Sequence, residues 1–184
     1  MKRGLDIITA LVGLIVLMPL FVVVAILIRA DSPGPVFFRQ ERIGKGFRPF
    51  WIYKFRTMVK DAPRKGGALT ASGDPRVTRI GKILRQTKID ELPQLINILR
   101  GDMSLVGPRP PLPSEVAQYE EWQKGRLAIK PGMTGLWQVR GRSNLSFDEG
   151  VLMDLYYIEN WSLRLYFMIL FRTIPAVLFS RGAY

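Results

Sequence analysis

The sequence contains no cysteine and no histidine among its 184 residues. Their absence excludes disulfides, Cys or His nucleophiles, Ser-His-Asp triads, and thiolate or imidazole metal sites. Covalent catalysis would therefore have to use Asp, Glu, Ser, Thr, Lys or Tyr. Acidic residues are also scarce, because 15 Asp and Glu stand against 27 Lys and Arg. Few side chains are thus available as a catalytic carboxylate.

The surplus of basic residues gives a net charge of +12 at neutral pH. Such a charge points to an anionic partner, which could be nucleic acid, a phosphorylated small molecule or the negative cytoplasmic leaflet of a membrane. The length is that of one domain with a modest core. Charge alone does not choose among these partners.

The N-terminal region carries no charged side chain from Ile7 to Ile28. As a straight helix this stretch would be roughly 33 Å long, enough to cross a hydrocarbon core of about 30 Å. No small-residue cleavage site follows it, so a removable signal peptide is not expected. The sequence therefore predicts a helix that inserts into a membrane.

Pro19 lies in the middle of this apolar stretch and is expected to bend the helix. Basic residues flank both ends, with Lys2 and Arg3 before the stretch and Arg29 after it. The positive-inside tendency would keep both ends cytoplasmic. We therefore predict a kinked, re-entrant membrane helix over residues 1–30. A single-pass anchor is the alternative, since proline kinks also occur in spanning helices.

Short strands are expected at residues 36–40 and 50–55, separated by a turn rich in glycine and basic residues, which together predict a β-hairpin. Residues 61–73 have the composition of a loop. Asp74-Pro75 resembles a helix cap followed by proline at the first helical position. We therefore expect a helix to start there.

Further along, the spacing of apolar residues from Leu92 to Leu99 predicts a helix. The prolines between 108 and 113 force an extended segment, and a helix is expected at about residues 114–124. A short strand is expected to run through residues 137–139. Ser146 and Glu149 form a capping box that starts another helix.

The last apolar segment, residues 161–180, contains Arg164, Arg172 and Pro175. A helix lying in the membrane interface, with its arginines reaching the headgroups, is the favoured interpretation. An ordinary core helix is the alternative. Together the elements predict an α+β fold, in which residues 31–184 form a cytosolic or interfacial catalytic domain.

Asp90 and Glu91 form the most informative pair in the chain. Pro93 is tolerated only in the first turn of a helix, which places Asp90 at or just before a helix start. Unpaired N–H groups and the positive dipole end favour anions there and keep a carboxylate ionised. Two carboxylates beside nearby cations suit a phosphate substrate and a bridging Mg²⁺. The alternative is that acids simply favour first helical turns.

Ordered motifs cover nearly the whole chain. They are Lys2-Arg3-x-x-Asp6, the broken apolar helix, residues 31–40, Lys54-Phe55-Arg56-Thr57-Met58, Asp90-Glu91-Leu92-Pro93-Gln94, Gly101-Asp102-Met103-Ser104, Pro108-Arg109-Pro110, residues 130–139, Gly141-Arg142 and Asp154-Leu155-Tyr156-Tyr157. In this order they resemble the small monotopic phosphoglycosyl transferases, also called bacterial sugar transferases. The number of ordered matches makes the resemblance specific.

The resemblance implies transfer of a phospho-sugar from a UDP-sugar to a polyprenyl (undecaprenyl) phosphate, with Mg²⁺ required and UMP released. The reaction would be the first membrane step of bacterial glycoconjugate or exopolysaccharide synthesis, on the cytoplasmic face of the inner membrane. The resemblance also implies that Asp90 is the nucleophile, giving an aspartyl-phosphosugar intermediate. Glu91 would assist Mg²⁺ or proton placement, so both acids are candidate metal ligands. Hexose-1-phosphate donors are weakly favoured by residues 155–161 and 181–184.

Three arginines are assigned to phosphate binding, because a planar guanidinium can bind two phosphate oxygens at once. They are Arg85, upstream of the acidic pair, and Arg109 and Arg142 in segments rich in Gly and Pro. Pro108 and Pro110 flank Arg109 in a segment that resembles the family's nucleotide-binding segment. Solvated surface charge is the alternative for each arginine.

Three further residues are candidates for substrate binding. Lys54 and Arg56 end the second predicted strand, with membrane-headgroup contact as the alternative. Asp154 lies among apolar helix residues, where a carboxylate is costly unless it is paired. It is expected either to pair with an arginine or to serve a metal or the substrate.

Two departures from the family pattern concern the membrane segment. Met18 precedes Pro19 where the family often has Ser, which leaves the depth and angle of the kink open. The additional multi-helix membrane domain of some members is missing, so the chain is expected to be a minimal member or the catalytic part of a larger one.

Membrane lipids are expected partners, and a homodimer is left open. A nucleic-acid-binding protein and a non-enzymatic membrane scaffold are the competing functions, but no nucleic-acid-binding module is recognised.

Overall fold

The computed structural model describes residues 2–62, 73–140 and 145–178. The helices are α1 (Lys2–Val16), α2 (Met18–Asp31), α3 (Arg79–Thr87), α4 (Gln94–Arg100), α5 (Pro113–Val116), α6 (Leu136–Arg140), α7 (Phe147–Glu159) and α8 (Leu163–Leu178). The strands are β1 (Phe37–Ile43), β2 (Pro49–Phe55), β3 (Ser104–Val106) and β4 (Gly132–Thr134). The 3₁₀ turns are η1 (Lys45–Phe47), η3 (Ile89–Glu91) and η4 (Trp122–Ala128). This mixture of helices with small sheets agrees with the predicted α+β class.

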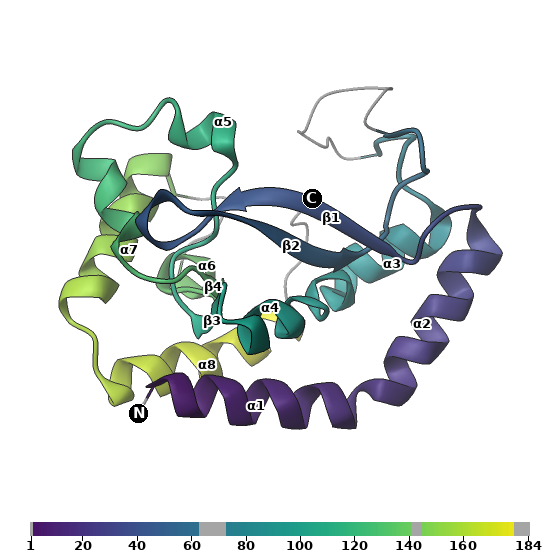
Figure 1. Cartoon of the computed structure of the whole chain (residues 1–184), viewed down its shortest axis with the longest axis horizontal. Coiled ribbons are helices and arrows are strands. Elements are labelled where there is room, and N and C mark those ends of the chain that lie inside the picture. Colours follow the sequence, from purple (N-terminus) through teal and green to yellow (C-terminus); the bar gives the residue numbers. More distant parts are fainter. Residues whose placement is uncertain (1, 63–72, 141–144, 179–184) are drawn as a thin grey trace.

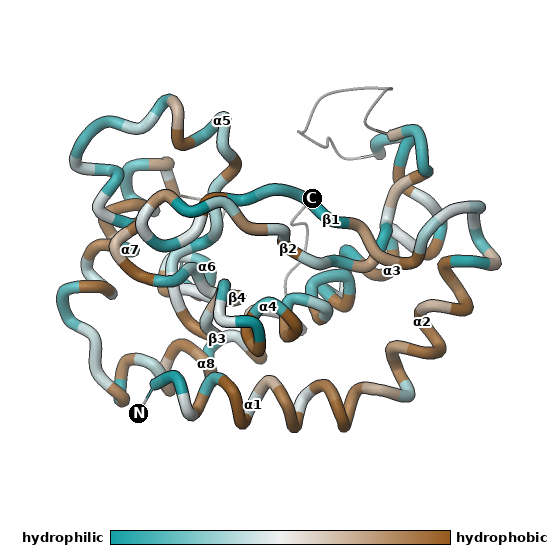
Figure 2. The backbone as a smooth tube through the Cα atoms, in the orientation of Figure 1, coloured by the Kyte–Doolittle hydropathy of each residue, from teal (hydrophilic) through white to brown (hydrophobic). Residues whose placement is uncertain are grey.

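The first two helices meet at a bend of 60° next to Pro19, which lies in the first turn of α2. Proline has no backbone N–H and cannot continue the hydrogen-bond ladder of a straight helix. The predicted bend is therefore confirmed. Figure 1 shows α1 and α2 as two sides of an angle with most of the chain inside it, and Figure 2 shows hydrophobic residues along most of both helices.

Within the described residues, no single helix is both long and apolar enough to cross a membrane. The bent pair α1–α2 passes that test of length and composition when its two helices are taken together. Large apolar side chains on the pair, such as Ile8, Val16 and Ile26, are exposed in the structure. The re-entrant path through a membrane stays a prediction.

The first turn of α1 is fixed to the remainder of the chain by polar contacts. Lys2 donates from Nζ to the Val106 carbonyl (3.0 Å), and Arg3 donates to the last two carbonyls before Arg100 in α4. Asp6 is buried, and its Oδ1 accepts hydrogen bonds from β3 and from the Tyr166 hydroxyl. A buried carboxylate needs such donors to offset its lost hydration. The start of α1 is thus attached to α4, β3 and α8.

The predicted hairpin is confirmed, although its strands are longer than expected. β1 and β2 are antiparallel, with a register from Phe37 opposite Phe55 to Ile43 opposite Pro49. Asn97 of α4 is buried, and its side-chain amide accepts from the Tyr53 N–H and donates to a β2 carbonyl, with N–O distances of 2.9 and 2.7 Å. These bonds dock α4 against β2.

β3 and β4 pair in parallel. Their backbones lie close together just beyond β3, because a Cβ on Gly132 would lie 2.0 Å from the Gly107 nitrogen. A side chain at either position would push the strands apart. The main core packs around this pair and includes Ile98, Tyr157 and Ile169.

Two helix boundaries differ from the sequence prediction. Asp74-Pro75 does not cap α3, because α3 begins at Arg79 and Thr78 caps it by accepting from the Gly81 N–H (3.0 Å). Asp74 instead accepts from the N–H of Arg76 in a tight turn. The same short polar side chain serves helix caps and isolated turns equally well, which explains the error.

The predicted helix at residues 114–124 is also wrong. Only α5, four residues long, and the separate 3₁₀ turn η4 form in this region. The strand expected through residues 137–139 is replaced by the helix α6, since β4 ends at Thr134. Most of the loop predicted at residues 61–73 lies outside the described residues.

The two C-terminal helices match their predictions more closely. The capping box is confirmed, with the Ser146 hydroxyl accepting from the Glu149 N–H and the Glu149 carboxylate accepting from the Ser146 N–H. α8 buries Tyr166 and Ile169 in the core and exposes Phe171 on the other side. The inner side of α8 thus packs in the core, and contact of its outer side with a membrane interface stays a prediction.

Candidate active site

Asp90 lies in the 3₁₀ turn η3 between α3 and α4, just before the helix start, as predicted. Lys88 adopts a left-handed conformation (φ 58°) that ends α3 and turns the chain. Ile89 packs against the cluster that contains Phe55 and Leu84. This anchor fixes the turn and with it the carboxylate that follows.

The Asp90 side chain is only 7% exposed, and its Oδ1 has no hydrogen-bond partner among the described residues. Burial raises the pKa of Asp90 to about 6, and the nearby charge of Lys54 opposes this rise. The helix start was expected to favour ionisation, so the net direction is opposite to that expectation. The carboxylate is still mostly ionised at neutral pH, and it is more basic than an ordinary aspartate.

Glu91 has the opposite electrostatic balance. Burial opposes its ionisation, but the charges of Lys54, Lys88 and Arg109 outweigh burial and hold its pKa below the usual range. The Lys54 Nζ lies 2.8 Å from Glu91 Oε1, which joins β2 to the turn η3. Two adjacent carboxylates with pKa values moved apart suit different chemical roles.

Arg85 approaches the same turn from the last turn of α3. Its Nε donates to the Thr57 hydroxyl (2.9 Å), and Asp90 is the carboxylate whose charge most strongly offsets the lowering of the Arg85 pKa by burial. α3 can come this close to Thr57 only because residue 81 is glycine, since a Cβ there would lie 2.0 Å from the Thr57 carbonyl oxygen. Arg85 is thus held by Thr57 and is electrostatically coupled to Asp90, and its role in phosphate binding stays a prediction.

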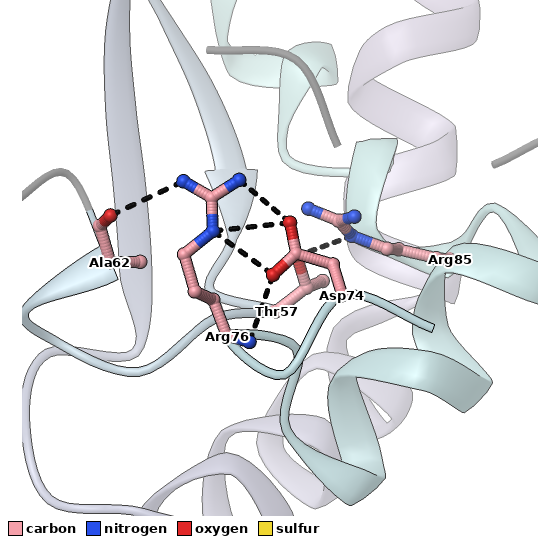
Figure 3. A network of polar contacts seen from close by, with 5 residues as sticks. All are labelled: Thr57, Ala62, Asp74, Arg76 and Arg85. Carbon is pink, nitrogen blue, oxygen red and sulfur yellow. Dashed lines mark hydrogen bonds and ion pairs between the residues drawn. The ribbon is translucent and has the colours of Figure 1, made fainter. Parts of the chain in front are cut away.

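An ion pair next to Arg85 holds the turn that precedes α3 (Figure 3). Arg76 Nη2 lies 2.6 Å from Asp74 Oδ2, and another guanidinium nitrogen donates to the Ala62 carbonyl (3.4 Å). The hydrogen bonds from Arg76 lower the pKa of Asp74 to about 2. The Arg85 guanidinium lies beside this pair in Figure 3, joined to Thr57 by its Nε alone.

Arg109 is presented between two buried residues, Pro108 and Pro110, while its own side chain is 46% exposed. Its Nη1 lies 3.7 Å from Glu115 Oε1, a loose contact that a stronger anion can replace. Its charge also helps to lower the pKa of Glu91, so it acts on the acidic pair. The candidate Arg142 lies outside the described residues.

Two of the predicted substrate ligands make contacts within the protein. Arg56 is buried and donates to the carbonyls of Ile28, Ser32 and Pro33 at the end of α2. Positive charge at a helix C-terminus is favourable, and these bonds make Arg56 a cap for α2. Its observed contacts thus differ from the predicted contact with substrate.

Asp154 is 1% exposed and pairs with Arg126, whose Nη2 lies 2.5 Å from its Oδ2. Arg126 also donates to the hydroxyl of Tyr119 (3.0 Å). Of the two roles expected for Asp154, the structure therefore shows the ion pair with an arginine. This pair connects η4 to α7.

The acidic pair fits a divalent cation that is shared with a substrate. In the part of the chain that the structure describes, no group of three or more acidic side chains converges on one point. Asp90 offers a buried oxygen without a partner, and Glu91 is next to it. Mg²⁺ is commonly held by one or two carboxylates together with substrate phosphates, so these residues fit it.

The sequence did not predict several residues that hold the site and the surrounding segments together. They are Arg42, Asn97 and Arg126, and the role of Thr57 was also not seen. An uncharged polar residue inside an apolar helix pattern could have drawn attention to Asn97. The other three depend on contacts between distant segments and carry no local signal.

Carboxylates held among Lys54, Arg85 and Arg109, beside a bent apolar helix pair, are typical of an enzyme that acts on phosphate compounds at a membrane. The family model of the bacterial sugar transferases matches residues 1–180. The chain belongs to this family and is a phosphoglycosyl transferase, which confirms the resemblance seen in the sequence.

Named relatives agree with this assignment. The chain is 41% identical over 198 residues to the exopolysaccharide production protein ExoY of Sinorhizobium fredii, covering 100% of this chain and 88% of the relative. It is 44% identical over 188 residues to the UDP-N-acetylgalactosamine-undecaprenyl-phosphate N-acetylgalactosaminephosphotransferase of Aeromonas hydrophila, covering 99% and 44%. It is 39% identical over 199 residues to the undecaprenyl-phosphate galactose phosphotransferase of Salmonella typhimurium, covering 100% and 42%. The chain thus spans most of the first relative and less than half of the other two.

Proposed function

We propose that this protein transfers a phospho-sugar from a UDP-sugar to a polyprenyl phosphate, such as undecaprenyl phosphate, and releases UMP. The observation that carries the proposal is the buried Asp90 with an unpartnered oxygen and a raised pKa among basic side chains. Relatives whose names specify undecaprenyl phosphate and a UDP-sugar support the substrates. The reaction would serve bacterial exopolysaccharide synthesis at the cytoplasmic face of the membrane, with hexose-1-phosphate as the favoured group.

The proposed chemistry has two displacements at one phosphorus atom. An oxygen of ionised Asp90 attacks the sugar-bearing phosphorus, a new P–O bond forms, and the bond to the bridging oxygen breaks. UMP leaves with that electron pair. An oxygen of the polyprenyl phosphate then attacks the same phosphorus, and Asp90 leaves as a carboxylate. Both nucleophiles are anions, so neither step needs a proton to be removed first.

The remaining residues act by positioning and by neutralising charge. Arg85, held by Thr57 and coupled by charge to Asp90, would bind phosphate oxygens of the donor. Arg109 would bind the diphosphate from the other side. Asp90 and Glu91 would hold Mg²⁺, which would supply charge neutralisation on the phosphate oxygens when bound. The Lys54 ion pair keeps Glu91 ionised for this role.

The test is a single-turnover experiment without acceptor. Wild-type protein with UDP-sugar and Mg²⁺ should release a burst of UMP of at most one equivalent, and a labelled phosphosugar should stay on the Asp90 peptide. Asp90→Asn should lose both the burst and the adduct. Glu91→Gln should turn over poorly but keep the attachment point, and Glu121→Gln, at a side chain that is 90% exposed, should behave as wild type.

Two outcomes would contradict the proposal. An adduct on the Asp90→Asn variant would place the nucleophile elsewhere. Release of UMP only when acceptor is present, with no adduct trapped, would favour direct attack by the lipid phosphate. The competing functions, a nucleic-acid-binding protein and a membrane scaffold, gain no support from the relatives.

A further inference from the structure

Arg42, at the end of β1, is a buried arginine that the proposed chemistry does not use. Its side chain is 8% exposed. Its Nη1 donates to the carbonyl of Pro110 (3.0 Å), and its Nη2 donates to Oε1 of Gln40 (2.7 Å). The N–H of the next residue, Ile43, donates to the Pro111 carbonyl (3.0 Å). The end of β1 is thus hydrogen-bonded to the segment that carries Arg109.

The composition of that segment explains why it needs donors from outside. Proline has no backbone N–H, so residues 110 and 111 can accept hydrogen bonds from a neighbouring strand but cannot donate any. Their carbonyls must therefore be held by groups that donate. Arg42 and the Ile43 N–H are those donors in the structure.

Placing a guanidinium at this position is costly. Burial and, to a lesser extent, the charge of Arg109 lower the pKa of Arg42 to about 10, although the charges of Glu115 and Glu91 act in the opposite direction. Among the described residues no carboxylate lies within ion-pair distance of Arg42, and its buried Nε has no hydrogen-bond partner. Burying a cation without an ion-pair partner costs free energy, so stability alone does not explain an arginine at this position.

The contacts of Arg42 link it to two basic residues that act on the acidic pair, Lys54 and Arg109. It lies on the same hairpin as Lys54, which binds Glu91 through its ammonium group. Through the Pro110 carbonyl it fixes the residue next to Arg109, whose charge acts on Glu91. One hairpin therefore contacts both the acidic pair and the segment expected to bind the nucleotide diphosphate.

We infer that Arg42 is a positioning residue for the donor: it holds the Pro110 carbonyl so that Arg109 faces the acidic pair, and it acts through Arg109. This inference rests on the proposed function, because the ligand of Arg109 is taken to be a nucleoside diphosphate-sugar. Gln40 has a supporting role, since its side-chain oxygen fixes the second Nη of Arg42.

The variant Arg42→Lys tests the inference, because an ammonium group keeps the charge but cannot bond both oxygens in the geometry of a planar fork. We expect the KM for UDP-sugar to rise about tenfold with kcat changed less than about threefold. The Kd for UMP, measured by calorimetry without turnover, should rise by a similar factor. Arg48→Lys, at an exposed arginine of the same hairpin, is the matched control and should leave both values unchanged.

A double-mutant cycle separates positioning from direct contact. If Arg42 acts through Arg109, adding Arg42→Lys to Arg109→Ala should raise the KM by less than about twofold further. Full multiplication of the two effects would show that Arg42 touches the donor itself and would overturn the inference. A wild-type KM and a wild-type Kd for UMP in Arg42→Lys would overturn it as well.

A third variant covers the case in which Arg42→Lys does not fold. Gln40→Ala leaves the buried charge in place and removes only the orienting oxygen, so it should raise the KM by about threefold without changing kcat. An unchanged KM in that variant would count against positioning. Failure of the proposed function has a different signature, because the wild type itself would then neither bind UMP nor release it.

Discussion

Replacing Asp90 with asparagine should abolish turnover and yet stabilise the protein at neutral pH. The carboxylate is buried, and its Oδ1 has no hydrogen-bond partner among the described residues. Asparagine has nearly the same size but carries no charge, so the cost of burying an ion disappears. A residue kept for chemistry at the expense of stability has this behaviour.

The size of the effect follows from the pKa. Burial raises the pKa of Asp90 from 3.8 to about 6. The folded state therefore binds this proton more tightly than the unfolded state, so ionised Asp90 destabilises the fold above pH 6 and has no such effect below about pH 4. At about 1.4 kcal/mol for each pH unit, the full penalty is about 3 kcal/mol. Burial of the asparagine amide offsets part of this, which leaves an expected gain of about 1–3 kcal/mol at pH 7.5.

Glu91→Gln is the internal contrast, since the sign of its effect is opposite. The charges of Lys54, Lys88 and Arg109 hold the pKa of Glu91 below its usual range despite burial. Its ionised form therefore stabilises the fold above the unfolded pKa, and this contribution is lost as pH falls. At pH 7.5 the variant should be less stable than the wild type.

The assay is urea unfolding of detergent-solubilised protein at pH 7.5 and pH 4, with a chelator present so that no bound Mg²⁺ contributes. Asp90→Asn should unfold at higher urea than the wild type at pH 7.5, and the difference should shrink at pH 4. The reasoning is refuted if Asp90→Asn is less stable at pH 7.5, or if its difference from the wild type is the same at both pH values.

Three further predictions concern parts of the fold that support the site. Gly81→Ala should destabilise the protein by about 1–3 kcal/mol in urea unfolding and weaken the UMP burst, because the new Cβ collides with the Thr57 carbonyl. Arg126→Leu leaves Asp154 buried and unpaired and should cost about 3–5 kcal/mol. Leucine at both positions should recover much of that loss, and no recovery would contradict the ion-pair argument. Pro19→Leu should straighten the bent pair. Single cysteines at its two ends should then label from opposite sides of the membrane, whereas same-side labelling of this variant would show that Pro19 does not set the path.

The sequence predicted those parts of the fold that local chemistry determines. The bend at Pro19 follows from a missing N–H, and the capping box at Ser146 follows from two side chains within one helical turn. The hairpin follows from a turn rich in glycine between two runs of β-prone residues. Each of these patterns specifies its structure without help from distant segments.

The predictions that failed depended on packing between segments. Asp74-Pro75 has the residues of a helix cap, but α3 starts later, at Thr78, where Gly81 lets the helix approach Thr57. Residues 137–139 favour strands by composition, yet they form α6. Local propensity is a weak signal where tertiary contacts decide the outcome.

The candidate site likewise has residues that the sequence could predict and features that it could not. Asp90 and Glu91 could be proposed as site residues from their position before a helix, and Lys54 from its motif. The direction of the Asp90 pKa could not, because it depends on how completely other segments bury the carboxylate. Asn97, which bonds to β2 from α4, could not be foreseen either, since its partners lie far away in the sequence.

The contacts of the first turn of α1 have a consequence for biogenesis. The Asp6 carboxylate accepts a hydrogen bond from the hydroxyl of Tyr166, 160 residues later, and Arg3 donates to a carbonyl of α4 that is 95 residues away. When α1 leaves the ribosome, none of these partners has been synthesised. A polar side chain is costly inside a membrane, so if the bent pair inserts as predicted, this end of α1 would stay at the water boundary until α8 is made. On that prediction, insertion of α1 and closure of the core would form one late event, and a chain released before α8 would lack the hydrogen bond from Tyr166 to Asp6.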